Sequence, residues 1–166
     1  MERLKICGRL ETRQFLDCGF SHMISIGDHD DALDGLRLPE IQPENYLCLR
    51  FSDTEDPSRS DCPTLANISP LFEWLSEVQI QRLLVHCTAG IGRSPAIALL
   101  ALSALDTEEP PLMHLERVTD SSECSYIWPN RLVVELGDQI LKREGVILSA
   151  LDEWQRVRAE KPQQKS

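Results

Sequence analysis

The residues best suited to chemistry lie in one short segment of the 166-residue chain, which reads His-Cys-Thr-Ala-Gly-Ile-Gly-Arg-Ser over 86–94. A thiol and an arginine stand at the two ends of a loop that contains Gly90 and Gly92. Such a loop can curl so that its backbone N–H groups converge on one anion, and a helix start adds positive potential there. The glycines permit the backbone angles that the curl requires. The residues expected to line the anion are Thr88, Ala89, Gly90, Ile91, Gly92 and Arg93.

The residue types in this loop fit the cleavage of a phosphate ester. Amide donors, an arginine and a helix start all favour the thiolate form of Cys87 at neutral pH. A thiolate can attack phosphorus and form a cysteinyl-phosphate. The planar guanidinium of Arg93 can grip two phosphoryl oxygens, which a lysine could not copy. Ser94 can hydrogen-bond the thiolate and assist its departure in a second step.

The pattern His-Cys-x5-Arg-Ser resembles the signature of the cysteine-dependent phosphatases, in the form found in protein-tyrosine and dual-specificity phosphatases. Thr88 stands where those proteins usually have serine. Trp128-Pro129-Asn130 follows at the place where dual-specificity phosphatases carry a Pro-Asn pair. The region from about 46 to 148 also resembles a group of short bacterial tyrosine-phosphatase-like proteins. The resemblance implies hydrolysis of phosphotyrosine in a phosphoprotein or phosphopeptide, without a cofactor, and leaves phosphoserine and phosphothreonine open.

Relatives in this family carry a general acid, an aspartate, on a movable loop about thirty residues before the cysteine, which selects the polar loop after residue 51. Asp53 directly follows a predicted strand and is the preferred acid, and Asp56 is the alternative. His86 either tunes the thiolate or is a hydrogen-bonded core histidine. Asn130 either braces the active-site loop or caps the helix that begins at Arg131.

The sequence also departs from the large tyrosine phosphatases. It is shorter, and it lacks both their Trp-Pro-Asp acid loop and a recognisable segment that clamps phosphotyrosine. A shallower pocket is implied. Two alternatives therefore stay open beside a protein phosphatase: an inactive phosphoprotein-binding module, and a phosphatase for a non-protein phosphoester.

Composition limits the partners and the location. The formal net charge is −10, with acidic stretches at 28–34 and 52–61 that are expected to be solvated loops, so nucleic acid and anionic membranes are not expected as partners. The chain has no apolar run long enough to cross a membrane and no apolar stretch at its start, which predicts a cytoplasmic protein. A monomer is favoured.

The six cysteines are expected to be free thiols in a reducing compartment. No pair of them has metal-ligand spacing, so no metal site is predicted. Cys48, Cys62 and Cys124 could form a reversible disulfide that protects Cys87, but buried spectator thiols are the preferred interpretation.

Apolar periodicity predicts an α/β fold with a small, mostly parallel sheet of four to five strands flanked by helices, as in cysteine phosphatases of the dual-specificity type. Pro70 is either inside the second helix or in the first turn of a helix capped by Ser69. Residues 1–160 are expected to form a single phosphatase domain and 161–166 a disordered tail. The predicted strands are 5–10, 21–27, 46–51 and 83–86, and the predicted helices are 12–18, 64–81, 94–105, 112–119, 131–143 and 146–159.

Overall fold

The computed structural model describes residue 1 and residues 3–160, and the predicted tail at 161–166 lies outside the described residues. Four strands form one parallel sheet in the order β1-β4-β2-β3. The strands are β1 (Arg3–Gly8), β2 (His22–Gly27), β3 (Tyr46–Arg50) and β4 (Arg82–Cys87). The predicted parallel sheet flanked by helices is confirmed.

The register of the sheet brings the carboxyl ends of its strands to one edge. Gly8 at the end of β1 lies opposite Cys87 at the end of β4, and Gly27 at the end of β2 lies opposite Arg50 at the end of β3. The loops that follow all four strands therefore leave from the same edge. In open α/β sheets this is the edge at which ligands bind.

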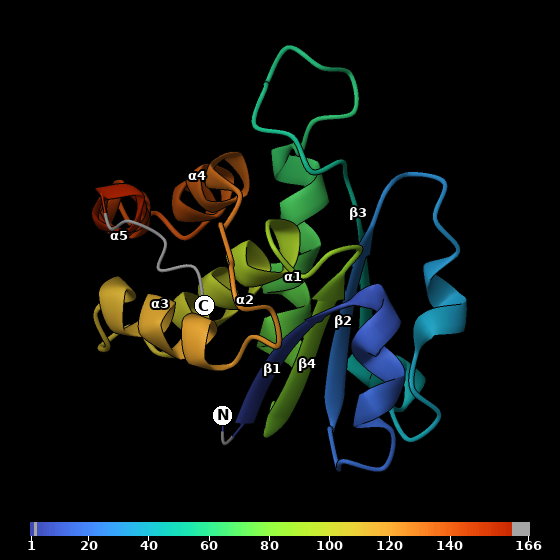
Figure 1. The fold of residues 1–166 in the computed structure, drawn as a ribbon. Coiled ribbons are helices and arrows are strands. Elements are labelled where there is room, and N and C mark those ends of the chain that lie inside the picture. The colour runs from blue at the N-terminus through green and yellow to red at the C-terminus, as the bar shows by residue number, and fades with distance from the viewer. Residues whose placement is uncertain (2, 161–166) are drawn as a thin grey trace.

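The two faces of the sheet are covered differently, as Figure 1 shows. Side chains alternate along each strand, so Ile6 and Val85 pack in the larger core with the α-helices, while Cys7 and Leu84 pack in a smaller core. The smaller core also contains Phe15, which belongs to a 3₁₀ helix. The helices are α1 (Leu65–Glu77), α2 (Arg93–Leu105), α3 (Pro111–Asp120), α4 (Arg131–Ile140) and α5 (Val146–Glu160), and the 3₁₀ helices are Arg9–Phe15, Leu33–Leu36 and Pro43–Asn45.

Helix α2 is apolar on all sides and almost wholly buried, as expected for a helix enclosed by other elements. Helix α4 can approach it closely because residue 137 is glycine. A Cβ added at Gly137 would lie 2.3 Å from a methyl carbon of Leu100. Within the described residues, none of the helices is long and apolar enough to cross a membrane.

Several element boundaries differ from the predictions. Strand β1 ends at Gly8, and the predicted helix 12–18 is instead a 3₁₀ helix that begins at Arg9. Helix α1 begins at Leu65 behind a capping box formed by Thr64 and Asn67, so Pro70 lies inside it and Ser69 is not its cap.

Helix α4 ends at Ile140 rather than at residue 143. Lys142, Glu144 and Gly145 have positive φ angles, which a helix cannot continue. The Asp138 carboxylate accepts hydrogen bonds from the N–H groups of Gly145 and Ile147, which stabilises the turn into α5.

Candidate active site

The segment 86–94 forms a loop between the central strand β4 and helix α2. Cys87 is the last residue of β4 and Arg93 the first residue of α2. Gly90 has a φ of 77°, and a Cβ there would lie 2.8 Å from the backbone of Cys7 and Gly8 on the neighbouring strand. Glycine is therefore required at this position for both conformation and space.

The Cys87 sulfur lies on the floor of this loop. The backbone N–H of Gly90 donates to the sulfur at 3.2 Å, and the Ser94 hydroxyl lies 3.2 Å from it. The Cys87 residue is 1% exposed, whereas the loop residues Thr88 and Ile91 are exposed. Donors directed at sulfur stabilise the thiolate relative to the thiol.

The Arg93 side chain is almost fully buried, and three hydrogen-bond partners fix its guanidinium group. One terminal nitrogen, Nη1, donates to the Asp28 carboxylate at 3.0 Å and to the Phe51 carbonyl at 2.8 Å. The other, Nη2, donates to the Thr88 hydroxyl at 3.0 Å. The Nε–H is buried and has no hydrogen-bond partner among the described residues. An acceptor from outside the chain could satisfy this donor.

Asp53 reaches the same loop from the end of β3. A Cβ added at Gly92 would lie 2.6 Å from a carboxylate oxygen of Asp53, so glycine leaves the space that this carboxylate occupies. Asn130 donates from Nδ2 to Asp53 at 2.9 Å and to the Thr54 carbonyl at 3.2 Å. Its Oδ1 accepts from the N–H of Val133, so Asn130 makes the contacts of both a brace and a helix cap.

Asp56 lies in the same acidic loop, but its carboxylate is hydrogen-bonded within that loop. Its Oδ1 accepts hydrogen bonds from the N–H of Ser58 at 2.9 Å and from the hydroxyl of Ser58 at 2.7 Å. These bonds lower the pKa of Asp56. In the described part of the chain, the structure brings Asp53, and not Asp56, against the loop 87–93.

No protein-family model matches this sequence, and no curated protein matches it either. Solved structures do match its fold. DUSP15 has a TM-score of 0.55 at 18% identity, over 90% of this chain and 90% of that chain. The human tyrosine phosphatase-like serine/threonine/tyrosine-interacting protein has a TM-score of 0.59 at 16% identity, over 85% of this chain and 92% of that chain. PTPMT1 in complex with PI(5)P has a TM-score of 0.54 at 19% identity, over 84% and 91%.

The chain has the dual-specificity phosphatase fold. Within this fold, the segment 122–130 packs against the candidate phosphate-binding loop. The N–H groups of Trp128 and Asn130 donate to the carbonyls of Ile91 and Gly92 at 2.9 and 3.1 Å. The rings of Trp128 and Tyr126 are stacked, with centroids 6.1 Å apart. Trp128 is connected to the loop through its backbone N–H.

His86 is fully buried and hydrogen-bonded, one step before the cysteine. Its Nε2 lies 2.5 Å from the Ser25 hydroxyl, which also receives a hydrogen bond from the Tyr46 hydroxyl at 2.8 Å. Burial lowers the pKa of His86 to about 4, so the ring is neutral at neutral pH. Nε2 thus makes the contact of a hydrogen-bonded core histidine, whereas Nδ1 is buried with no hydrogen-bond partner among the described residues. A further effect of His86 on the thiolate stays a prediction.

Three charged residues at this edge of the fold were missed by the sequence analysis. Asp28 binds Arg93, and Asp31 forms a salt bridge with Arg9 at 2.5 Å, while the Arg9 N–H donates to the Thr88 carbonyl. The hydrogen bond from Arg9 lowers the pKa of Asp31 to about 2. Asp28 is exposed, as predicted for the solvated loop 28–34, but Asp28 and Asp31 also pair with arginines at the candidate site. Their position just after β2 could have indicated this, because β2 ends at the same edge as β4.

All six cysteines are free thiols in the structure, as predicted. Two of them lie near the Cys87 loop. The Cys124 thiol contacts the Ala89 carbonyl at 3.3 Å, and Cys7 lies on the neighbouring strand. Burial raises the pKa of both thiols, that of Cys7 to about 12. Both are therefore poor nucleophiles at neutral pH, in contrast to the role expected of Cys87.

Proposed function

We propose that this chain is a phosphomonoester hydrolase that acts on phosphotyrosine in proteins or peptides through a cysteinyl-phosphate intermediate. The observation that carries the proposal is the arrangement around one loop. The Cys87 sulfur lies on its floor within 3.2 Å of the Gly90 N–H and the Ser94 hydroxyl, and Asp53 lies against its far side. Arg93 stands at its end with an Nε–H that has no hydrogen-bond partner among the described residues. A nucleophile, an oxyanion binder and a proton donor are thereby within one site.

In the first step the Cys87 thiolate attacks phosphorus, and the bond from phosphorus to the leaving oxygen breaks. The non-bridging phosphoryl oxygens accept hydrogen bonds from the loop amides and from Arg93, whose orientation is already fixed by Asp28 and Phe51. Asp53, held by Asn130, gives its proton to the leaving oxygen. The products of this step are an alcohol or phenol and the cysteinyl-phosphate.

In the second step water attacks the phosphorus of the cysteinyl-phosphate. The Asp53 carboxylate, now deprotonated, takes a proton from this water, and the sulfur–phosphorus bond breaks. Ser94, at 3.2 Å from the sulfur, can donate a hydrogen bond to the departing thiolate and keeps its proton. Inorganic phosphate leaves, and both the thiolate and the protonated acid are restored.

The proposed substrate follows from the family resemblance together with the rim of the site. Loop residues Thr88, Ala89 and Ile91 are exposed, which fits a shallow site that also admits phosphoserine and phosphothreonine. The proposal assigns this activity to one domain, 1–160, acting as a cytoplasmic monomer. It includes Asp53 as the general acid, with Asp56 as the alternative.

A non-protein phosphoester is the second candidate, because one structural neighbour is PTPMT1 in complex with PI(5)P. The charges of this chain argue against an anionic lipid headgroup. Asp28 and Asp31 lie beside the loop, and the formal net charge is −10. The third candidate is an inactive phosphoprotein-binding module, since another neighbour is described as a tyrosine phosphatase-like interacting protein.

Hydrolysis of a chromogenic aryl phosphate tests the proposal. The wild type should turn over with a bell-shaped pH profile, whose limbs report thiolate formation and protonation of the acid. Cys87→Ser should be inactive, and Asp53→Ala should lose roughly 100- to 10,000-fold in rate, the range for a general acid. Asp56→Ala is the matched control and should stay close to the wild type.

Equal rates for the wild type, Cys87→Ser and Asp53→Ala would exclude the enzyme proposal. Damage by Asp56→Ala with little effect of Asp53→Ala would reassign the acid. If the wild type is inactive, binding of a phosphotyrosine peptide to Cys87→Ser distinguishes the binding module from a chain that recognises no phosphoester. A comparison of phosphopeptides with PI(5)P as substrates then decides between the protein and lipid candidates.

A further inference from the structure

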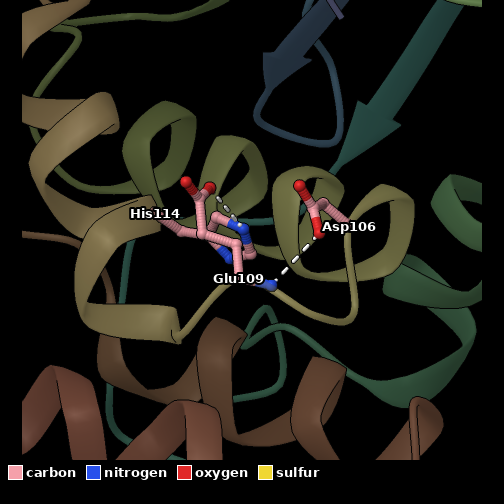
Figure 2. Close-up of side chains that lie close together, drawn as sticks. All are labelled: Asp106, Glu109 and His114. Carbon is pink, nitrogen blue, oxygen red and sulfur yellow. Dashed lines mark hydrogen bonds and ion pairs between the residues drawn. The ribbon is translucent and has the colours of Figure 1, made fainter.

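A second cluster of ionisable side chains lies at the other end of helix α2, outside the proposed active site (Figure 2). Asp106 directly follows α2, Glu109 lies in the loop to α3, and His114 lies in the first turns of α3. One ligand atom from each, a carboxylate oxygen or an imidazole nitrogen, lies within 4.8 Å of the other two. Asp106 and Glu109 thus come from the connection between α2 and α3, and His114 comes from α3.

The contacts of His114 indicate a missing partner. Its side chain is 1% exposed, and its Nδ1 lies 3.2 Å from the Ser103 hydroxyl. Its Nε2 lies 2.9 Å from Glu109 Oε2, yet this buried nitrogen has no hydrogen-bond partner among the described residues. The carboxylate is thus close to the nitrogen but does not accept a well-directed hydrogen bond from it.

Either protonation of the neutral ring leaves this contact unsatisfied. If Nδ1 carries the proton and donates to Ser103, the lone pair of Nε2 faces a negatively charged oxygen. If Nε2 carries the proton, its N–H is not directed at the Glu109 oxygen. A cation bound by both atoms would satisfy the nitrogen lone pair and the carboxylate together.

The other two residues leave room for such a cation. Asp106 accepts hydrogen bonds from the N–H groups of Glu108 and Glu109 with Oδ1, and its exposed side chain can turn. Glu109 Oε2 also receives Arg117 Nη1 at 2.7 Å. Arg117 therefore competes with a cation for the same carboxylate, and its side chain is partly exposed and able to move away.

We propose that Asp106, Glu109 and His114 bind one divalent cation of the zinc class, which ties the end of α2 to the start of α3. Imidazole together with carboxylates suits zinc, whereas magnesium and calcium prefer oxygen ligands alone. Ligand atoms about 2.0–2.2 Å from zinc can be at most about 4.4 Å apart, so small side-chain rotations complete the site. The Ser103 hydroxyl would fix the ring orientation through Nδ1.

This site differs from the prediction of no metal site, which rested on the spacing of the cysteines alone. It is also independent of the proposed phosphatase chemistry. Helix α2 has 13 residues, so at a rise of about 1.5 Å per residue the cluster lies about 20 Å from the start of α2. The cation would stabilise the α2–α3 connection and would take no part in catalysis.

Calorimetric titration of the full chain with zinc tests the site, in a Cys87→Ser host so that the active-site thiol cannot bind the metal. We expect one equivalent to bind, with the unfolding temperature rising as the zinc concentration rises. Asp106→Asn and Glu109→Gln should each weaken binding by roughly 100-fold, because loss of even an outer-shell partner costs about 10- to 100-fold. Glu108→Gln, an exposed neighbour in the same loop, is the matched control and should bind like the host.

Two further measurements sharpen the assignment. Arg117→Gln should bind zinc more tightly, because it removes the cation that competes for Glu109. Cobalt substituted for zinc should give a visible spectrum without the near-ultraviolet thiolate charge-transfer band that cysteine ligands produce. No saturable binding, equal affinity in Asp106→Asn, Glu109→Gln and the host, or a thiolate band would each overturn the proposal.

Discussion

The two ends of helix α2 are built from the sequence in different ways. At the amino end, Arg93 and Ser94 follow Cys87 within one continuous loop, so residues that are neighbours in the sequence meet in space. At the carboxyl end, Asp106, Glu109 and His114 meet only after the chain has turned into α3. A continuous motif can be recognised in the sequence, whereas a cluster that forms through loop closure cannot.

The contacts at the two ends also differ in kind. Arg93 is 3% exposed and is held by a carboxylate, a carbonyl and a hydroxyl, which leaves little freedom of orientation. Asp106 is exposed, and Glu109 is shared between His114 and Arg117. Changes at the amino end should therefore affect the proposed turnover more than stability. Changes at the carboxyl end should do the reverse.

Of the changes at the two ends of α2, Arg93→Lys should have the largest effect on aryl phosphate turnover. Lysine keeps the positive charge but loses the planar fork and the Nε–H, so aryl phosphate turnover should fall roughly 1000-fold, the upper range for removal of an oxyanion donor. Steady-state kinetics measures this, and thermal unfolding checks that the fold survives. Arg59→Lys, on an exposed arginine that pairs with Asp61, should have no effect on turnover. A loss of less than tenfold in Arg93→Lys would place the oxyanion binder elsewhere.

His86→Gln should change how stability depends on pH. The pKa of His86 is about 4 when folded and 6.5 when unfolded, so the unfolded chain binds more protons between these values. Wild-type stability should therefore be full above pH 6.5 and fall by up to about 3 kcal/mol as the pH drops to 4. Chemical denaturation at several pH values should show a shallower slope in His86→Gln. His29→Gln, on an exposed loop, should keep the wild-type slope.

If His86→Gln and the wild type lose stability equally between pH 6.5 and 4, the buried imidazole is not the group that titrates. The buried histidine next to the cysteine would then contribute to packing alone. The same denaturation curves give the free energy of unfolding at pH 7, where loss of the imidazole hydrogen bond to Ser25 should cost His86→Gln some stability.

Asn130→Asp separates the two roles that the structure gives to Asn130. Aspartate keeps an acceptor for the Val133 N–H but loses the amide donor to Asp53. Turnover should fall about 10- to 100-fold because the acid loses its positioning and faces a like charge, while the cap remains. Asn130→Ala should lose both functions, including about 1 kcal/mol of stability from the cap. If Asn130→Asp selectively loses the limb of the pH profile assigned to the acid, Asn130 positions Asp53. If Asn130→Asp and Asn130→Ala lose the same stability, the two roles are not separable in this way.

Much of the fold followed from the sequence because buried parallel strands and apolar helices leave strong patterns. The strand at 21–27 and the helix at 94–105 were placed within one residue of β2 and α2. The errors lie at the ends of helices and strands, where local contacts decide which residue is the last one. The predicted helix 64–81 already ends at Glu77, and positive φ angles after Ile140 stop α4 early.

The site was predictable only where its residues are contiguous or follow a strand of the same edge. Cys87, Arg93 and Ser94 lie in one contiguous segment. Asp53 was preferred because the family resemblance selects its loop and because it follows a strand there. Asp28 was missed, although it also follows a strand, because its pairing with Arg93 depends on the strand order β4-β2-β3. Sequence patterns predict strands better than they predict which strands are neighbours.

Glu109→Gln should have the smallest effect on activity. It tests whether a change at the carboxyl end of α2 leaves turnover at the amino end unaffected. The glutamine keeps the size of the side chain but removes the charge that pairs with Arg117 and faces His114. Stability without added metal should change by about 1 kcal/mol at most, because the pair with Arg117 is partly exposed and Glu109 accepts no well-directed hydrogen bond from His114. Aryl phosphate turnover should stay within about twofold of the wild type, since a surface change away from the site usually shifts energies by less than about 0.5 kcal/mol. A larger loss of turnover with the fold intact would mean that the two ends of α2 are coupled, and that the carboxyl end contributes to the position of Arg93.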